Sequence, residues 1–430
     1  MLRGTKFIAT TMREVIETTE PTSTPKTADQ RLGSRFSNEQ MSWFLMATHA
    51  VEHVLSAALP PLFVLIQQNL GLSYTQVGLL STMRSTTSGL AQAPVGVLVD
   101  KTGAKKPLAI GFALVSLALL LSGLAPSYTV LLLVQIISGF GSSAYHPATY
   151  SIVTRLANGA RVGKKLAFHT FGGFVGTTVS FVVVAFLGVR FGWRNALIIL
   201  SIPGFVLAYL FWLLFDIPKQ QQEKKPEAAP AAKKAVTSGI VALVGVTTVQ
   251  GMFSRGLSAF LPVFLVAAYG MSVQQAALYA TLMTGTGCLG LLGGGVIADK
   301  FPRPRVLMVA SLMLCATSLV LAQSTLTPLL LALVLMLSGL AQHGSGPSQT
   351  ALVSEIGPKG SQGSLFGLTF AGSFLGGSLV TIIAGWMADA LGVRSIFVFL
   401  AALALTRAAM TIPLARIVSR TKEQGVEVSG

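Results

Sequence analysis

The sequence predicts an all-α integral membrane protein with twelve transmembrane helices in two pseudo-symmetric six-helix halves around a central cavity. The first reason is composition: apolar residues make up 52% of the 430 residues, charged residues only 11%, and the mean hydropathy is +0.68. A soluble domain of ordinary composition carries roughly a quarter charged residues. The second reason is an internal repeat, and the third is the placement of the basic residues along the chain.

The repeat has an offset of 199 to 200 residues. The segment 96–100 (GVLVD), which is followed by a basic turn, recurs as the segment 295–299 (GVIAD). The pair Ser138-Gly139 recurs as Ser338-Gly339. Two copies of one membrane unit are the layout of a secondary transporter, whose two halves rock about a site between them.

Twelve apolar segments each approach the ~20 residues that a membrane-spanning helix requires. They cover residues 42–67, 75–99, 107–125, 128–150, 166–188, 194–215, 238–268, 275–298, 306–323, 327–350, 364–388 and 395–417. The chain is therefore expected to comprise a disordered cytoplasmic tail (1–41), an N-terminal six-helix bundle (42–215), a cytoplasmic linker (216–237), a C-terminal six-helix bundle (238–418) and a second cytoplasmic tail (419–430).

The basic residues sort by side when both termini are placed in the cytoplasm. The cytoplasmic segments then hold 25 of the 31 Lys and Arg residues, and the outside loops hold only Arg190, Arg194 and Arg394. This is the positive-inside pattern of membrane proteins. The net charge of +16 follows from that topology and does not indicate a nucleic-acid partner. We expect a monomeric, multi-pass protein of a bacterial cell inner (plasma) membrane, surrounded by the lipid bilayer.

The turn that follows the second apolar segment (DKTGAKK, residues 100–106) carries a family resemblance. With twelve spans and a long central cytoplasmic loop, it resembles the major facilitator superfamily over residues 42–418. A narrower resemblance, to the fosmidomycin-resistance branch, lies in the segment 139–147 (GFGSSAYHP) and in the entry to the second span at 73–78. That branch includes proton-driven drug exporters.

The superfamily resemblance implies a gate at the cytoplasmic ends of the helices. A carboxylate there is favoured beside the N-terminus of another helix, which in this superfamily is the eleventh span, beginning here near residue 364. The expected gating residues are Asp100, Lys101, Gly103, Lys105 and, in the second copy of the turn, Asp299. The second copy departs from the pattern, because Pro302 replaces the glycine of the turn.

Ionisable residues inside the spans indicate where the chemistry lies, because charge at membrane depth is costly unless it faces a cavity or a partner. Glu52 is the one acidic residue deep within a predicted span, and it shares a helix face with His49 and His53. A buried carboxylate beside imidazoles can take up and release a proton near neutral pH. We therefore predict that these three residues couple transport to protons. The alternative is a static network of hydrogen bonds between helices.

Two arginines within spans predict the charge of the substrate. Arg84 and Arg255 lie deep in the second and seventh spans, where a guanidinium facing a cavity would bind a carboxylate, phosphate or phosphonate. His146, which precedes a helix-kinking proline, and His343 are further candidate substrate-binding residues. The alternative is structural, with Arg84 paired to Glu52 and Arg255 bonded to helix carbonyls.

These observations predict a proton-coupled exporter of a small organic anion or drug. An importer of an organic anion of the carboxylate or phosphonate type would use the same parts. A third possibility is a transition-metal importer, because the spacing of His49 and His53 suits one metal ion on a helix. An enzyme is not expected, since the sequence shows no nucleophile–base pair and no phosphate-binding loop, and we expect no cofactor and no resident metal.

The basic-residue pattern predicts how the chain is oriented. Single cysteines introduced at Ser127 or Gly192, after replacement of Cys288 and Cys315, should react with a membrane-impermeant thiol reagent added outside intact cells. A cysteine at Ala232 should react only after the cells are opened. Labelling with the opposite sidedness would contradict the predicted topology.

Overall fold

The computed structural model describes residues 37–156, 162–214, 238–323, 325–356 and 362–423. Every regular element in these ranges is a helix, as predicted. They are α2 (Asn38–Ser56), η1 (Pro60–Leu62), α3 (Phe63–Leu70), α4 (Tyr74–Thr102), α5 (Lys105–Leu124), α6 (Tyr128–Ser143), α7 (Tyr145–Leu156), α8 (Val162–Leu214), α9 (Ser238–Tyr269), α10 (Val273–Lys300), α11 (Arg303–Gln323), α12 (Pro328–Gly344), α13 (Gly346–Ile356), α14 (Gln362–Leu391) and α15 (Ser395–Glu423). The predicted linker and most of both tails lie outside the described residues.

Ten helical segments of the described chain are long and apolar enough to cross a membrane. One of them, Lys164–Leu213, contains two helices joined at Gly192, whose φ of 80° is not helical. Helix α4 is 29 residues long but is not among the ten. Its centre (STMRSTTS, residues 81–88) carries Arg84 and a run of hydroxyl side chains, which lower its hydropathy.

Local backbone structure repeats at the offset seen in the sequence. Ser73 begins α4 with a capping box in which its hydroxyl accepts from the backbone of Gln76, and Ser272 begins α10 in the same way. The turns that precede them use Gly71 and Gly270, both in the left-handed region at φ 61° and 64°. The starts of α4 and α10 are therefore built alike in the two sequence copies.

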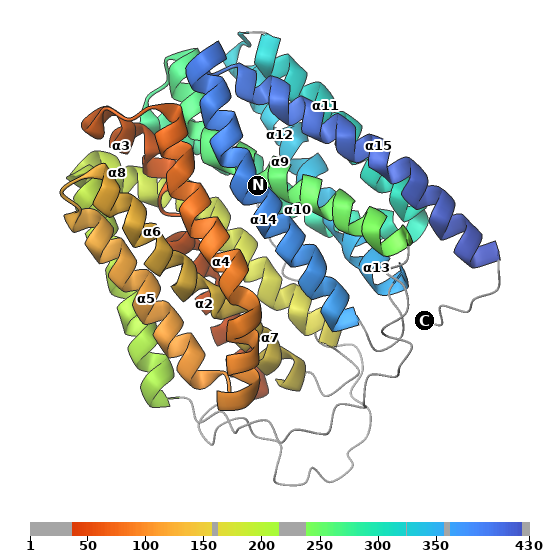
Figure 1. Ribbon diagram of the computed structural model, residues 1–430, viewed down its shortest axis with the longest axis horizontal. Helices are drawn as coiled ribbons and strands as arrows, with labels where there is room; N and C mark the ends of the chain where they lie inside the picture. Colours follow the sequence, from red (N-terminus) through yellow and green to blue (C-terminus); the bar gives the residue numbers. More distant parts are fainter. Residues whose placement is uncertain (1–36, 157–161, 215–237, 324, 357–361, 424–430) are drawn as a thin grey trace, which may run out of the picture.

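The chain's two long stretches of helix lie on opposite sides of the molecule (Figure 1). The helices before residue 214 occupy one side, and those after residue 238 occupy the other. Two long helix pairs join the sides: α4 packs along α14, and α8 packs along α10. We call the end where α4 begins and α14 finishes the Asp389 end, and the end where α4 finishes the Asp100 end.

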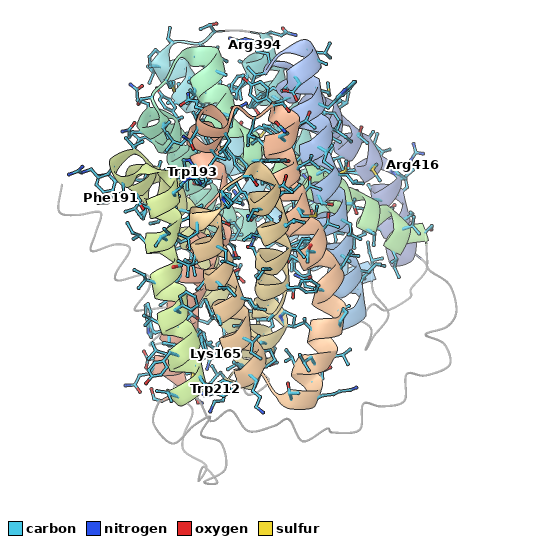
Figure 2. All side chains as sticks on the ribbon, turned by 60° about the vertical axis from the view of Figure 1, so that its left-hand side comes forward. Lys165, Phe191, Trp193, Trp212, Arg394 and Arg416 are labelled. Atoms are coloured by element: carbon cyan, nitrogen blue, oxygen red, sulfur yellow. The ribbon has the colours of Figure 1, made fainter. Side chains whose placement is uncertain are left out.

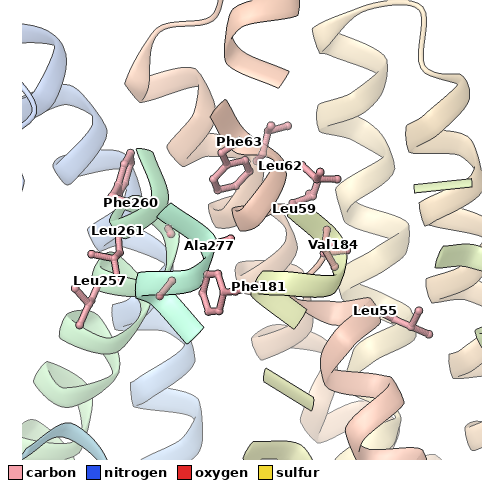
Figure 3. Close-up of a cluster of buried hydrophobic side chains, with 14 of the residues drawn as sticks. Leu55, Leu59, Leu62, Phe63, Phe181, Val184, Leu257, Phe260, Leu261 and Ala277 are labelled. Atoms are coloured by element: carbon pink, nitrogen blue, oxygen red, sulfur yellow. The ribbon is translucent and has the colours of Figure 1, made fainter. Parts of the chain in front are cut away.

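A buried apolar cluster connects both sides towards the Asp389 end (Figure 3). Leu62 and Phe63, at the junction of η1 and α3, are completely buried, as is Phe260 of α9. Phe181 of α8 lies beside Ala277 of α10, and both side chains are buried. Apolar packing therefore fills the space between the two sides in this region.

The outer surface is apolar, as expected for helices surrounded by lipid. Large side chains such as Leu329, Leu289 and Tyr209 are more than 60% exposed. Such an extent of exposed apolar surface is uncommon on soluble monomers and marks contact with an apolar environment. Figure 2 shows Lys165 and Trp212 near one end of the helices and Arg394 at the other, so charged and aromatic groups flank the apolar band.

Candidate functional site

Four of the five histidines, His49, His53, His146 and His169, lie together. The sequence had predicted a shared position only for His49 and His53. The ring of His49 stacks on that of His169, with centroids 4.2 Å apart and planes 16° from parallel. His53 and His146 meet His49 edge-on at centroid distances of 4.7 and 5.5 Å. The cluster thus combines side chains of α2, α7 and α8 that are separated by up to 120 residues in the chain.

Hydrogen bonds fix how two of these rings are turned. His49 donates from Nδ1 to the carbonyl oxygen of His169 at 2.8 Å. The Nδ1 of His53 is 2.7 Å from the hydroxyl of Thr177, which itself donates to the carbonyl of Gly173. With Thr177 donating to that carbonyl, His53 donates from Nδ1 to the hydroxyl; in His49 the donation from Nδ1 leaves Nε2 as the acceptor in the neutral ring. Among the described residues, the buried Nε2 of His49 and Nδ1 of His146 have no hydrogen-bond partner.

Glu52 is buried and points away from the second sequence copy. Ser56 donates a short hydrogen bond to its carboxylate, and the Nε2 of His53 lies 3.8 Å from the other carboxylate oxygen. The carboxylate also lines a small void formed with Gly111 of α5 and Tyr145 of α7. The predicted stripe of Glu52, His49 and His53 is therefore one connected group, but its acid faces α5 and α7.

Arg84 and Arg255 lie near each other where the two sides of the molecule come together. The Nε of Arg84 donates to the hydroxyl of Ser138 on α6 at 3.3 Å, and Arg255 of α9 donates from Nη1 to the hydroxyl of Ser85 on α4, also at 3.3 Å. Arg255 lies over the ring of Phe374 on α14, 4.1 Å from its centroid. Through its bond to Ser85, Arg255 therefore contacts the residue that follows Arg84.

Neither arginine forms an ion pair with a carboxylate in the part of the chain that the structure describes. Glu52 is near enough to attract the charge of Arg84 but is not bonded to it. Arg255 bonds to a serine hydroxyl instead of the helix carbonyls of the structural alternative. Two like charges are thus held together with hydroxyl partners, which is the arrangement that an anionic ligand would stabilise.

The other predicted residues are spread over the molecule. His343 on α12 meets Phe174 edge-on at 4.9 Å, apart from the four clustered histidines. Asp100 and Lys101 are exposed, and Asp100 makes no hydrogen bond or ion pair among the described residues. Gly103 has a φ of 82° and closes the turn after α4. Asp299 lines an open hollow beside the ion pair of Arg303 and Glu355.

Two residues outside the predicted site have conspicuous contacts. Arg407 of α15 is 1% exposed and donates to Ser311 at 3.1 Å and to Gln349 at 3.2 Å. Asp389, near the end of α14, accepts three hydrogen bonds from the first residues of α4. Nothing in the sequence spacing connects positions 74 and 389.

Comparison with known proteins identifies the family. The family model of the Major Facilitator Superfamily matches residues 45–369 and 243–427. The chain belongs to this superfamily. The family resemblance predicted from the sequence is therefore confirmed, and the chain is related to membrane transporters.

Among the chain's relatives is the fosmidomycin resistance protein of Escherichia coli (strain K12), which is 24% identical over 81% of this chain and 86% of the relative. The MFS-type transporter YfnC of Bacillus subtilis (strain 168) is 25% identical over 82% and 87% of the two chains. A probable L-galactonate transporter of Escherichia coli (strain K12) is 25% identical over 75% and 77%.

A solved structure shares the fold. The bacterial homolog of the human lysosomal transporter Spinster, in an inward-facing and unoccupied conformation, superposes with a TM-score of 0.77 at 18% identity and covers 89% of this chain and 98% of its own. At this identity the likeness establishes the arrangement of helices and carries no information on the substrate.

Proposed function

We propose that this chain is a secondary active transporter that works by alternating access and exports a small organic anion or drug in exchange for protons. The observation that carries the proposal is the pair of guanidiniums, Arg84 from α4 and Arg255 from α9, which lie near each other and have no carboxylate partner among the described residues. They come from the two copies of the repeat. A ligand held by both would sit where alternating access exposes it to each side in turn.

The names of several relatives support an anionic substrate. Besides the probable L-galactonate transporter, they include a probable galactarate/D-glucarate transporter and a hexuronate transporter of Bacillus subtilis, and a probable sulfoacetate transporter of Cupriavidus necator. Each of these compounds carries at least one acid group. We therefore propose an anionic substrate for this chain, without assigning it any of these individual compounds.

The arrangement in the membrane is part of the proposal. Dividing the segment Lys164–Leu213 at Gly192 and adding α4 to the ten apolar segments gives twelve spans. We infer two six-helix halves, residues 42–215 and 238–418, around a central cavity in a bacterial inner membrane. Both termini are then cytoplasmic, so the Asp100 end faces the cytoplasm and the Asp389 end faces outside.

Proton coupling is assigned to Glu52 with His49 and His53. Glu52 is buried, touches an imidazole and lies near enough to attract Arg84. A change in its charge would therefore be felt at the substrate-binding guanidinium. Import of an organic anion together with protons would use the same residues. Measuring the direction in which a proton gradient moves the substrate distinguishes export from import.

A second candidate function, transport of a transition-metal ion, is favoured by a specific arrangement of His49, His53 and His146. One ligand nitrogen of each lies within 4.8 Å of the others. Two of the rings use Nδ1 for hydrogen bonds, which is how metal-binding histidines are commonly oriented. Imidazole nitrogens suit Zn²⁺, Ni²⁺ and Cu²⁺. The neighbouring guanidinium of Arg84 opposes a cation, and for this reason we place the anion first.

Replacing either central arginine should weaken binding of the anion. Arg84→Ala and Arg255→Ala should each reduce affinity roughly ten- to a hundredfold, because one charge-assisted contact contributes about 1.5–3 kcal/mol. Lysine at either position should restore affinity only in part, since it lacks the planar fork. Affinity is measured by substrate-induced shifts in thermal unfolding across a panel of carboxylates and phosphonates. Arg416→Ala, at an exposed position near the end of α15, is the matched control. Unchanged affinity in both alanine variants for every transported anion would refute the anion site.

Removing the charge of Glu52 should uncouple transport from the proton gradient. Glu52→Gln is expected to abolish pH-driven movement of substrate in proteoliposomes while leaving substrate exchange at equal pH largely intact. Glu39→Gln, an exposed acid in the first turn of the same helix, is the control. Continued accumulation against a gradient by Glu52→Gln would transfer the coupling role to the histidines or to another ion.

Metal binding by the purified protein tests the second candidate. If the histidines hold a cargo ion, Zn²⁺ or Ni²⁺ should bind with one-to-one stoichiometry in calorimetry, and His146→Ala should weaken binding at least tenfold. His343→Ala, whose ring lies outside the cluster, should bind as the wild type does. Absence of binding at millimolar metal would remove this candidate.

A further inference from the structure

The first turn of α4 is capped by a residue that lies 315 positions away in the sequence. The backbone N–H groups of Tyr74 and Thr75 donate to the two carboxylate oxygens of Asp389, each at 2.8 Å, and the hydroxyl of Thr75 donates to one of them at 2.6 Å. The first N–H groups of a helix have no partner within the helix, and its N-terminus attracts negative charge. Asp389 therefore supplies what α4 lacks, from the end of α14.

The local cap of α4 does not compete with this contact. The hydroxyl of Ser73 accepts from the N–H of Gln76, one turn into the helix. The N–H groups of Tyr74 and Thr75 are left for Asp389. Three donors thus converge on one carboxylate, and charge-assisted hydrogen bonds of this kind are the stronger ones in proteins.

The helices beside this cap approach closely. A side chain on Gly385, one turn before Asp389 on α14, would place its Cβ 2.5 Å from the carbonyl oxygen of Tyr74 and 2.8 Å from the Cα of Thr75. Further along, the hydroxyl of Thr82 donates to the carbonyl of Ser378 at 2.7 Å. Backbone contacts of this closeness leave no path between α4 and α14 at the Asp389 end.

The same two helices differ at the Asp100 end. Leu98 of α4 and Leu368 of α14 are 46% and 49% exposed, and a Cβ on Gly96 or Gly367 would meet no atom within 4 Å. Asp100, the acid expected to hold this end closed, makes no hydrogen bond or ion pair within the described ranges. Helices α4 and α14 are therefore joined through Asp389 at one end and lie apart at the Asp100 end.

We propose that Asp389 is the latch of the outer gate: its bonds to Tyr74 and Thr75 hold the outside of the transporter shut in this conformation and break when that side opens. The assignment of the Asp389 end to the outside rests on the topology given under the proposed function. Breaking three charge-assisted bonds opposes opening, so the strength of this cap sets the balance between the inward-open and outward-open states.

With this latch, α4 would contact α14 at a different end in the inward-open state than in the outward-open state. In the outward-open state the cap at Tyr74 is broken, and Asp100 is the acid available to hold the other end of the same helix. Each end of α4 would then pair with α14 alternately. Asp389 is thus a device of gating, distinct from the residues proposed to bind the anion or carry the proton.

Distance measurement across the outer end tests the latch without any substrate. Spin labels at Gln68 of α3 and Leu391 of α14, both exposed, report separation of the two sides there by pulsed EPR, with Cys288 and Cys315 replaced. The unsubstituted background should give one short distance. Asp389→Asn, which keeps the shape but removes the charge, should raise a longer-distance population about tenfold.

Two further variants serve as a weaker version of the test and as a control. Thr75→Val removes one of the three hydrogen bonds and should raise the longer-distance population about two- to fivefold, which keeps the test available if Asp389→Asn fails to fold. Glu39→Gln removes an exposed acid from the first turn of α2 and should leave the distances unchanged. A single short distance in both Asp389→Asn and Thr75→Val would overturn the proposal.

The outcome is separable from the fate of the proposed function. The spin-label distances depend on neither the anion nor the proton, so the latch stands even if Arg84 and Arg255 prove not to bind substrate. Thiol reagents that reach Leu391→Cys only from the cytoplasm would refute the proposed topology and with it the assignment of Asp389 to the outer gate, whereas the spin-label distances would still report whether Asp389 holds this end closed. Reaction from outside, together with the widened distance, would support both.

Discussion

The cost of placing charge within a membrane governs this structure. Arg84 and the hydroxyl side chains around it lower the hydropathy of α4 below that of the ten most apolar helical segments, yet α4 packs between α6 and α14. The guanidinium is tolerated because it is turned inwards, where Ser138 accepts its hydrogen bond and Glu52 attracts its charge. Arg407 is accommodated in the same way, by hydroxyl and amide groups of α11 and α13. Where such charges lie therefore decides which helix faces can meet lipid and which must pack.

That constraint explains how much the sequence could predict. Apolar length and the repeat are local or periodic signals, and they predicted the all-helical fold, while the turn at residues 100–106 carried the resemblance to the superfamily. The polar stripe of α2 was predictable because His49, Glu52 and His53 are fixed relative to one another by helix geometry. The break between α6 and α7 near Pro147 was predictable because proline lacks the N–H that a continuous helix requires.

Contacts between distant segments could not be predicted. His169 joins the histidine cluster from α8, 120 residues after His49, because its ring and carbonyl both meet that side chain. Phe374 lies under Arg255 because α14 packs along α9. Asp389 accepts from the backbone N–H groups of Tyr74 and Thr75. Because every residue except proline has such a group, the residue types at these positions do not reveal the pairing. Such pairings depend on how the helices pack against one another, and a single sequence does not show which helices become neighbours.

The repeat shows where symmetry is kept and where it is broken. The turn and cap that begin α4 match those that begin α10: Gly71 and Ser73 recur as Gly270 and Ser272 with the same backbone roles. The site residues do not match. At the same offset Arg84 of α4 corresponds to Met283 of α10, which is buried and apolar, and His146 before Pro147 corresponds to Gly346 before Pro347. Under the proposed function, the two halves would therefore present unlike walls to an anionic substrate. Symmetry is kept in the backbone where these helices begin, whereas each residue proposed to bind the substrate belongs to one copy only.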